Sequence, residues 1–414
     1  MSPSRTVPPR ESGVLLHVTS LPGGRLGAPA RAFVDWLAAA GQSWWQVLPL
    51  GPPDSHGSPY SSPSAFAGWN GILADPDARV STRAVDAFRA ANPYWAPSWE
   101  AYAGPGALAD QVRFVREWSA LRAYANRRGV RIIGDLPIYV AAASADHLQH
   151  PELFRSGVVA GVPSGPTNDR GQRWGNPCYD WPAVRRSGYA WWIARMRHTA
   201  SLYDLVRIDH FRGFVAGWEI PTTTRGVKGR WRPGPGKELF DVLTAELGPL
   251  AVIAEDLGVI TPAVHRLRDA CGFPGMVVLQ WAFGGGARNP HALDRHPVNA
   301  IAYTGTHDTP TIAQWWKSIA RPHERAAARG ACDALGITDT DRSWALVRLA
   351  LASNARIAII PAQDLLGLGA SARMNRPGTH TRNWVWRLDE HALDDGLALR
   401  LRAATDHARR IVQH

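Results

Sequence analysis

YDLVRIDHFRG, residues 203–213, begins as a short apolar strand and ends in charged residues. Arg207 and Asp209 are separated by one residue, so on a strand their side chains lie on the same face. A guanidinium beside a carboxylate favours the ionised form of that carboxylate. Taken alone, the two residues most simply form an ordinary ion pair at the end of a strand. An ionised carboxylate in this position is also what a glycosidic nucleophile requires, and the rest of the chain decides between these interpretations.

Short apolar segments recur along the chain and are predicted as strands. They lie at residues 14–18, 44–48, 130–134, 203–208, 250–254, 276–281, 300–303 and 357–360. Helical periodicity separates most of them, at residues 30–40, 111–128, 189–200, 237–247, 262–270, 312–320, 323–335, 343–353 and 389–412. This alternation predicts an α/β protein, a (β/α)8 TIM barrel with loop insertions after strands two and three. We expect a single catalytic domain over residues 1–414, with residues 51–110 and 141–200 as insertions at its C-terminal face.

The composition is that of a globular protein, with 45% hydrophobic and 20% charged residues in a chain of 414. No uninterrupted apolar run reaches the length that crosses a membrane. The first residues are polar and rich in proline, without the apolar core of a signal peptide, so we expect a cytoplasmic protein. The three cysteines are too few and too widely spaced for a disulfide framework or a zinc site.

The net charge of +11 raises nucleic acid as a possible partner. The basic residues are scattered, however, and no run of five or more of them occurs, so we expect no nucleic-acid binding. The 19 tryptophans are compatible with a carbohydrate enzyme, because the flat indole face stacks on sugars. Tryptophan is more often buried in the core, so this count alone proves nothing about function.

Charged residues follow four of the predicted strands. They are Asp135 after strand three, Arg207 and Asp209 on strand four, Glu255 after strand five, and His307 and Asp308 after strand seven. The C-terminal strand ends of such a barrel carry its catalytic residues. Carboxylates crowded on one rim repel each other, so a structural reason for this set is hard to find. Clustered carboxylates without the spacing of metal ligands indicate chemistry at a glycosidic bond.

The surroundings of each carboxylate suggest its role. Asp209, beside Arg207, is expected to stay ionised and to attack the anomeric carbon. Glu255 follows apolar residues and has no neighbouring cation in the sequence, so it is the better candidate for a raised pKa and for the general acid. Asp308 would grip sugar hydroxyls, with a further hydrogen bond from His307. The alternative for these last two residues is a capping pair at the next helix.

The sequence resembles a known family over most of its length. The matching segments are SGVLLHVTSLPGG (12–24), FVDWLAAAGQSWWQVLPLGP (33–52), SPYSSPSAFAG (58–68), GVRIIGDLPIYVA (129–141), GQRWGNPCYDW (171–181), RIDHFRGF (207–214), IAEDLGVITPAV (253–264), GFPGMVVLQWAF (272–283), YTGTHD (303–308) and ARMNRPGT (372–379). They resemble the amylomaltases, the 4-α-glucanotransferases of glycoside hydrolase family 77 in the α-amylase clan.

The resemblance implies a retaining double displacement on α-1,4-glucans and maltooligosaccharides, without a metal or an organic cofactor. It makes Asp209 the nucleophile, Glu255 the general acid and base, and Asp308 the stabiliser of the transition state. The implied substrate contacts are Arg207, His307, Ser58, Tyr60, Asp135, Gln172, Trp174 and Asn375. The 4-hydroxyl of a second glucan, rather than water, then resolves the glucosyl-enzyme. We expect Tyr60 and Trp174 to form the surfaces that favour this acceptor.

The chain also departs from the family pattern. The region between residues 71 and 111 is expected to be shortened, and Gly284-Gly285-Gly286 stands where an acidic pair often follows Phe283. These departures bear on the preferred glucan length and on the balance of transfer to hydrolysis. They leave the catalytic residues in place. The alternatives that stay open are a plain α-1,4-glucan hydrolase of the same clan and a catalytically inactive glucan-binding protein. The sequence carries no indication of the oligomeric state.

Overall fold

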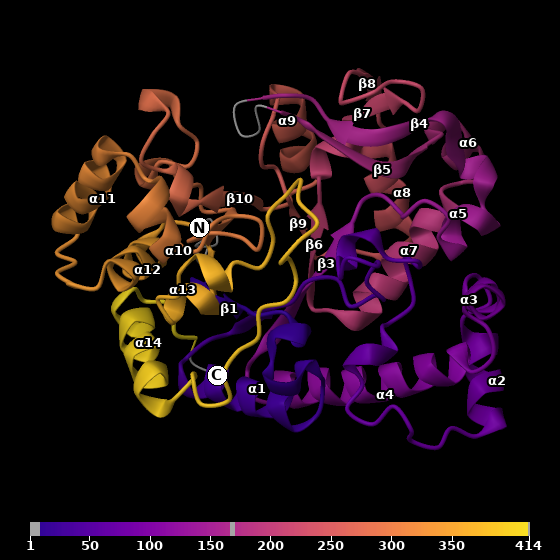
Figure 1. Ribbon diagram of the computed structural model, residues 1–414, viewed down its shortest axis with the longest axis horizontal. Coiled ribbons are helices and arrows are strands. Elements are labelled where there is room, and N and C mark those ends of the chain that lie inside the picture. The colour runs from indigo at the N-terminus through magenta and orange to yellow at the C-terminus, as the bar shows by residue number, and fades with distance from the viewer. Residues whose placement is uncertain (1–8, 166–169, 413–414) are drawn as a thin grey trace, which may run out of the picture.

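The computed structural model describes residues 9–165 and 170–412 (Figure 1). Eight parallel strands form one sheet in the order β10-β11-β12-β1-β2-β3-β6-β9. They are β1 (Glu11–Leu15), β2 (Trp44–Gln46), β3 (Arg131–Pro137), β6 (Leu205–Asp209), β9 (Val252–Ala254), β10 (Gly275–Val278), β11 (Ala300–Tyr303) and β12 (Ile357–Pro361). The N–H of Ala254 on β9 donates to the carbonyl of Pro274, directly before β10, over 2.9 Å, so the two edge strands approach each other. The barrel is nearly closed, and the predicted (β/α)8 fold is confirmed.

Helices lie around the barrel and in the segments inserted into it (Figure 1). They are α1 (Ala28–Ala39), α2 (Thr82–Ala91), α3 (Ala96–Ala103), α4 (Ala107–Asn126), α5 (Ala145–Gln149), α6 (Trp181–Arg186), α7 (Ala190–Leu202), α8 (Lys237–Leu247), α9 (Pro262–Ala270), α10 (Ile312–Gln314), α11 (Pro322–Ala334), α12 (Arg342–Ala352), α13 (Ala362–Leu365) and α14 (Asp395–His407). Gly41 follows the C-cap of α1 with a φ of 69°, a left-handed conformation that glycine adopts readily where a helix ends. No helix among the described residues is both long enough and apolar enough to cross a membrane.

A second, antiparallel sheet stands beside the barrel, in the order β5-β4-β7-β8 (Figure 1). Its strands are β4 (Phe154–Val162), β5 (Gln172–Tyr179), β7 (Ala216–Pro221) and β8 (Arg230–Pro233). The prediction of loop and helix over residues 141–200 is therefore wrong for β4 and β5. The prediction also missed that the segment after β6, the fourth barrel strand, supplies the other half of this sheet. The sequence of β4, FRSGVVAGV, has no regular alternation because much of the strand is only partly buried.

Several predicted boundaries shift by a few residues. The first strand begins at Glu11 rather than at residue 14, and the sixth ends at Val278, where a 3-10 turn begins. The predicted helix at 312–320 is α10 followed by a π-helical turn, Trp315–Ile319. The last helix begins only at Asp395, because the side chain of Asp394 caps it by accepting the N–H of Leu397 over 2.7 Å.

The barrel strands are buried on both faces. Outward side chains such as Val206 and Ile208 belong to the main core beneath the helices. Inward side chains form a separate core, in which the hydroxyl of Tyr303 on β11 donates across the barrel to Gln46 on β2 over 3.0 Å. Alternation along β6 then places Arg207 on the inward face, on the same side as the residue at the strand's end, Asp209. The carboxyl end of the barrel interior therefore carries these two charged side chains.

Candidate active site

Arg207 lies at the centre of a charged group on two neighbouring strands. Its Nη1 is 2.6 Å from Oδ2 of Asp135 on β3, and its Nη2 is 2.9 Å from Oδ1 of Asp209 on its own strand. The pairing register sets Asp135 directly opposite Arg207. The side chains of Asp135 and Arg207 are 0% and 5% exposed, whereas that of Asp209 is 28% exposed. Of the two carboxylates that Arg207 binds, only Asp209 is open to solvent.

Asp135 is held from two sides inside the barrel mouth. Its Oδ2 accepts the hydroxyl of Tyr60 over 2.7 Å in addition to the guanidinium of Arg207. Burial raises the pKa of Asp135 to about 7, with Arg207 and Tyr60 opposing this shift. The predicted substrate contact of Asp135 would therefore be made through Tyr60 and Arg207, since its own side chain has no exposed surface.

Glu255 directly follows β9, the strand that pairs with β6. Ile208 pairs with Ala254, so the following residues, Asp209 and Glu255, emerge side by side at the ends of β6 and β9. Backbone N–H groups donate to both carboxyl oxygens of Glu255, from His210 to Oε2 over 2.7 Å and from Leu257 to Oε1 over 3.1 Å. Burial raises the pKa of Glu255 to about 8; Arg207 opposes this shift, and the charge of Asp209 adds to it. The two adjacent carboxyl groups thus have different environments.

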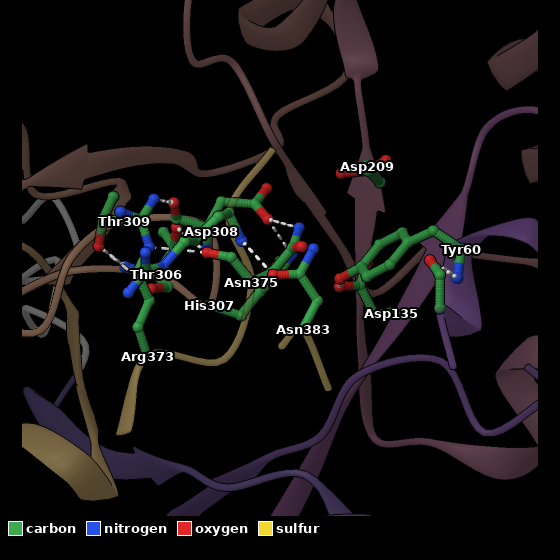
Figure 2. Close-up of polar contacts among 12 residues, drawn as sticks. Tyr60, Asp135, Asp209, Thr306, His307, Asp308, Thr309, Arg373, Asn375 and Asn383 are labelled. Carbon is green, nitrogen blue, oxygen red and sulfur yellow. Dashed lines mark hydrogen bonds and ion pairs between the residues drawn. The ribbon is translucent and has the colours of Figure 1, made fainter. Parts of the chain in front are cut away.

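Asp308 is the centre of a third group, beyond the end of β11. Its Oδ1 accepts the side-chain N–H of Asn375 over 2.6 Å and lies 3.3 Å from Nε2 of His307. Figure 2 shows this group on one side and Tyr60, Asp135 and Asp209 on the other. The side chain of Asp308 is 41% exposed, whereas that of His307 is 6% exposed. Burial lowers the pKa of His307, which favours a neutral imidazole.

Aromatic rings join these groups. Tyr60 stacks on His307 with 5.1 Å between ring centroids, and Trp384 lies 5.8 Å from Tyr60 and 6.0 Å from His307. Tyr60 itself is oriented by Ser58, whose hydroxyl accepts the N–H of Tyr60 over 3.3 Å. Trp384 was not among the residues predicted from the sequence. Its position shortly after the ARMNRPGT segment was the available signal.

The second sheet contributes the remaining predicted residues. Nε1 of Trp174 on β5 donates to the side chain of Gln172 over 2.7 Å. Trp174 meets His210 edge to face, with 4.8 Å between ring centroids, and His210 is the residue whose N–H holds Glu255. His210 adopts a left-handed conformation with φ of 54°, and it was not predicted as a site residue because nothing in the sequence indicates this conformation. The structure thus brings Gln172 and Trp174 to the same rim as Glu255.

Potential metal ligands do not gather at this rim. Across residues 9–165 and 170–412, no three or more His, Cys, Asp or Glu side chains are grouped so that they could hold a metal ion. Each carboxylate discussed above instead has hydrogen-bond donors from the protein. The arrangement offers a partly exposed carboxylate beside a cation in Asp209, a neighbouring carboxyl with a raised pKa in Glu255, and an exposed carboxylate held by an amide and an imidazole in Asp308.

Comparison with known proteins assigns the chain to a family. The model of the family described as 4-alpha-glucanotransferase matches residues 16–94 and 107–393. The 4-alpha-glucanotransferase of Thermus thermophilus is 40% identical, covering 97% of this chain and 99% of that protein. The chloroplastic/amyloplastic enzyme of Arabidopsis thaliana is 39% identical, covering 94% of this chain and 83% of that protein. The amylomaltase of Streptococcus agalactiae, solved in complex with acarbose, superposes with a TM-score of 0.88 at 31% identity, covering 97% of this chain and all of that one.

The unmatched residues 95–106 fall inside the region, 71–111, that we expected to be shortened. The alignment with the Thermus protein runs over 500 residues, so that relative has segments that this chain of 414 residues lacks. The shared blocks nevertheless span the barrel from its first strand to the segment after its last. The chain therefore belongs to glycoside hydrolase family 77, the family of the 4-alpha-glucanotransferases or amylomaltases.

Proposed function

We propose that this 4-alpha-glucanotransferase moves α-1,4-glucan segments between maltooligosaccharides by a retaining double displacement through a glucosyl ester of Asp209. The observation that carries the proposal is the placement of Asp209 and Glu255 at adjacent, paired strand ends. Neighbouring strands lie roughly 4.8 Å apart. Side chains that leave neighbouring strand ends can bring their carboxyl groups to the separation of about 5–5.5 Å found in retaining enzymes.

In the first step Asp209 attacks the anomeric carbon of the donor. Arg207 binds Oδ1 of Asp209, which leaves Oδ2 to form the new bond. Glu255 gives its proton to the glycosidic oxygen, the bond to that oxygen breaks, and the shortened glucan leaves with a free 4-hydroxyl. The raised pKa of Glu255 keeps this proton in place at neutral pH.

In the second step the 4-hydroxyl of an acceptor glucan attacks the same carbon. The ionised Glu255 now takes the hydroxyl proton, the ester to Asp209 breaks, and both carboxyl groups return to their starting states. Asp308, with Asn375 and His307, would hold sugar hydroxyls and favour the distorted ring of the transition state. Water resolving the ester instead would make the protein a hydrolase.

Acceptor preference is proposed to come from aromatic surfaces on two sides of the carboxylates. Trp174 on β5 is half-buried, and Tyr60 is fixed by Asp135 and by the stack on His307. Half-exposed aromatic faces bind sugar rings and displace water from the ester. A cytoplasmic location and the absence of nucleic-acid binding stay predictions from the sequence.

The test is the product pattern from maltotriose. Transfer yields glucose together with a ladder of longer maltooligosaccharides, whereas glucose and maltose alone would show that water is the acceptor. Asp209→Asn should abolish both outcomes. Asp241→Asn, which changes an exposed carboxylate on α8 that pairs with Lys237, is the matched control and should keep the ladder. Wild-type activity in Asp209→Asn would show that another group is the nucleophile.

A further inference from the structure

Two histidines from distant parts of the chain meet at the edge of the candidate active site. The ring centroids of His56 and His380 are 4.7 Å apart, with 38° between the ring planes, and both residues are exposed. His56 lies in the loop after β2, two residues before Ser58, and His380 lies in the long segment after α13 that also carries Asn375. None of the roles proposed above uses either histidine.

We infer that His56 and His380 form a binding site for a divalent cation of the borderline class, such as Zn²⁺ or Ni²⁺, which joins the two loops across the rim. Metal–nitrogen distances of about 2.0–2.1 Å around a tetrahedral ion place the centres of two coordinated imidazole rings roughly 5 Å apart. The observed 4.7 Å between the ring centroids is close to that separation, and rotation of the two exposed side chains would bring one nitrogen of each ring to the ion.

Each turn that carries a histidine is held by its own hydrogen bonds. Oδ1 of Asp54 accepts the N–H groups of His56 and Ser58 over 2.8 and 2.9 Å. On the other side, the side chain of Asn383 accepts the N–H of Arg376 over 3.0 Å and donates to the carbonyl of Thr379 over 2.9 Å. Turns fixed in this way lose little freedom when an ion binds, which favours binding.

The chemistry of the pair selects the cation. Imidazole nitrogen suits Zn²⁺, Ni²⁺ and Cu²⁺, whereas Mg²⁺ and Ca²⁺ prefer oxygen ligands. Because no third His, Cys, Asp or Glu completes a cluster among the described residues, water would fill the other positions around the ion. Such a site with two protein ligands would release its metal readily to a chelator.

The two loops lie next to the aromatic rings of the candidate active site, those of Tyr60 and Trp384. Gly57, next to His56, faces the side chain of Trp384, and Trp384 contacts Tyr60. Figure 2 shows Tyr60, which follows His56 in the chain, and Asn383, which follows His380. A cation held between the two loops would therefore restrict their movement and obstruct the path of a glucan chain. The expected inhibition of glucan transfer by the metal rests on the proposed function, whereas the expected binding of the metal does not.

The experiment is thermal unfolding of the tag-free protein with ZnCl₂, NiCl₂ or MgCl₂. A ligand that binds only the folded state raises Tm. Zn²⁺ and Ni²⁺ should raise the Tm of the wild type, Mg²⁺ should not, and EDTA should reverse the shift. His56→Asn, His380→Asn and the double variant should lose the shift. His265→Asn, which changes an exposed histidine on α9, should keep it. An unchanged shift in the double variant, or no shift in the wild type, would overturn the site.

Transfer from maltotriose is measured in parallel. Zn²⁺ should lower the wild-type rate and leave the double variant, which is active without metal, unaffected. Equal inhibition of both proteins would show that the metal acts elsewhere, for example on the carboxylates. Inactivity of the metal-free wild type would instead count against the proposed function, and the Tm readout would still decide the metal site.

Discussion

Replacing Glu255 with Gln tests whether burial of this carboxyl supplies the acid of the reaction. Burial raises its pKa from the ordinary 4.5 to about 8. At pH 7 a carboxyl with a pKa of about 8 is about nine-tenths protonated, whereas one with a pKa of 4.5 is protonated about 0.3% of the time. The site therefore holds roughly 300 times more general acid at neutral pH than an ordinary glutamate would provide.

The assay is the pH dependence of kcat/KM for the donor, which reports ionisations of the free enzyme. With maltotriose, whose leaving oxygen must be protonated, kcat/KM should fall about tenfold per pH unit above pH 8, because Glu255 loses its proton there. With an α-glucosyl fluoride donor, whose fluoride leaves without protonation, this fall should disappear. Glu255→Gln should lose roughly 10²- to 10⁴-fold on maltotriose and much less in forming the glucosyl-enzyme from the fluoride.

Asp135 is the group that must be distinguished from Glu255, because burial raises its pKa to about 7. Asp135→Asn removes that ionisation and should keep the fall of kcat/KM above pH 8. The reasoning would be refuted by a fall that is equally steep with both donors, or by one that persists in the residual activity of Glu255→Gln. Either result would mean that another group provides the proton.

Two further predictions concern Arg207 and Trp174. Arg207→Met should destabilise the fold by about 3–5 kcal/mol in urea unfolding at pH 8, where Asp135 is mostly ionised, and by less at pH 6, because it leaves the buried carboxylate without its cation; a loss below about 1 kcal/mol at pH 8 would contradict this account. Trp174→Ala should raise the share of glucosyl-enzyme resolved by water, measured as glucose released relative to longer products from maltotriose. The control for the second variant is Trp231→Ala, a half-buried tryptophan on β8 of the same small sheet, which should leave that ratio unchanged.

The barrel and its charged rim could be predicted because both are local patterns. Each barrel strand is a short apolar run, and charges such as Arg207 and Asp209 appear where the run ends. The register that puts Glu255 beside Asp209 follows once neighbouring strands are paired. The fold and the charged residues at the strand ends could therefore be predicted from the sequence.

The features that were missed depend on tertiary contacts. Strand β4 pairs with β5 and with β7, which lies more than 50 residues further along the chain, and its partly exposed face gives no alternating signal. The left-handed conformation of His210, which directs its N–H to Glu255, is likewise set by the surrounding structure. Residue types alone cannot report a conformation that most residues avoid.

The geometry explains why an arginine, rather than a lysine, occupies position 207. Its Nη1 binds Asp135 and its Nη2 binds Asp209, so one planar cation holds two carboxylates at fixed separate points. A lysine ammonium is a single point charge on a flexible stem and could hold only one of them well. Loss of the contact with Asp135 would leave the guanidinium less firmly positioned. Loss of the contact with Asp209 would instead leave the carboxylate of the nucleophile less firmly positioned. Because the charge of Asp209 also raises the pKa of Glu255, the orientation of one guanidinium affects both carboxyl groups of the proposed reaction.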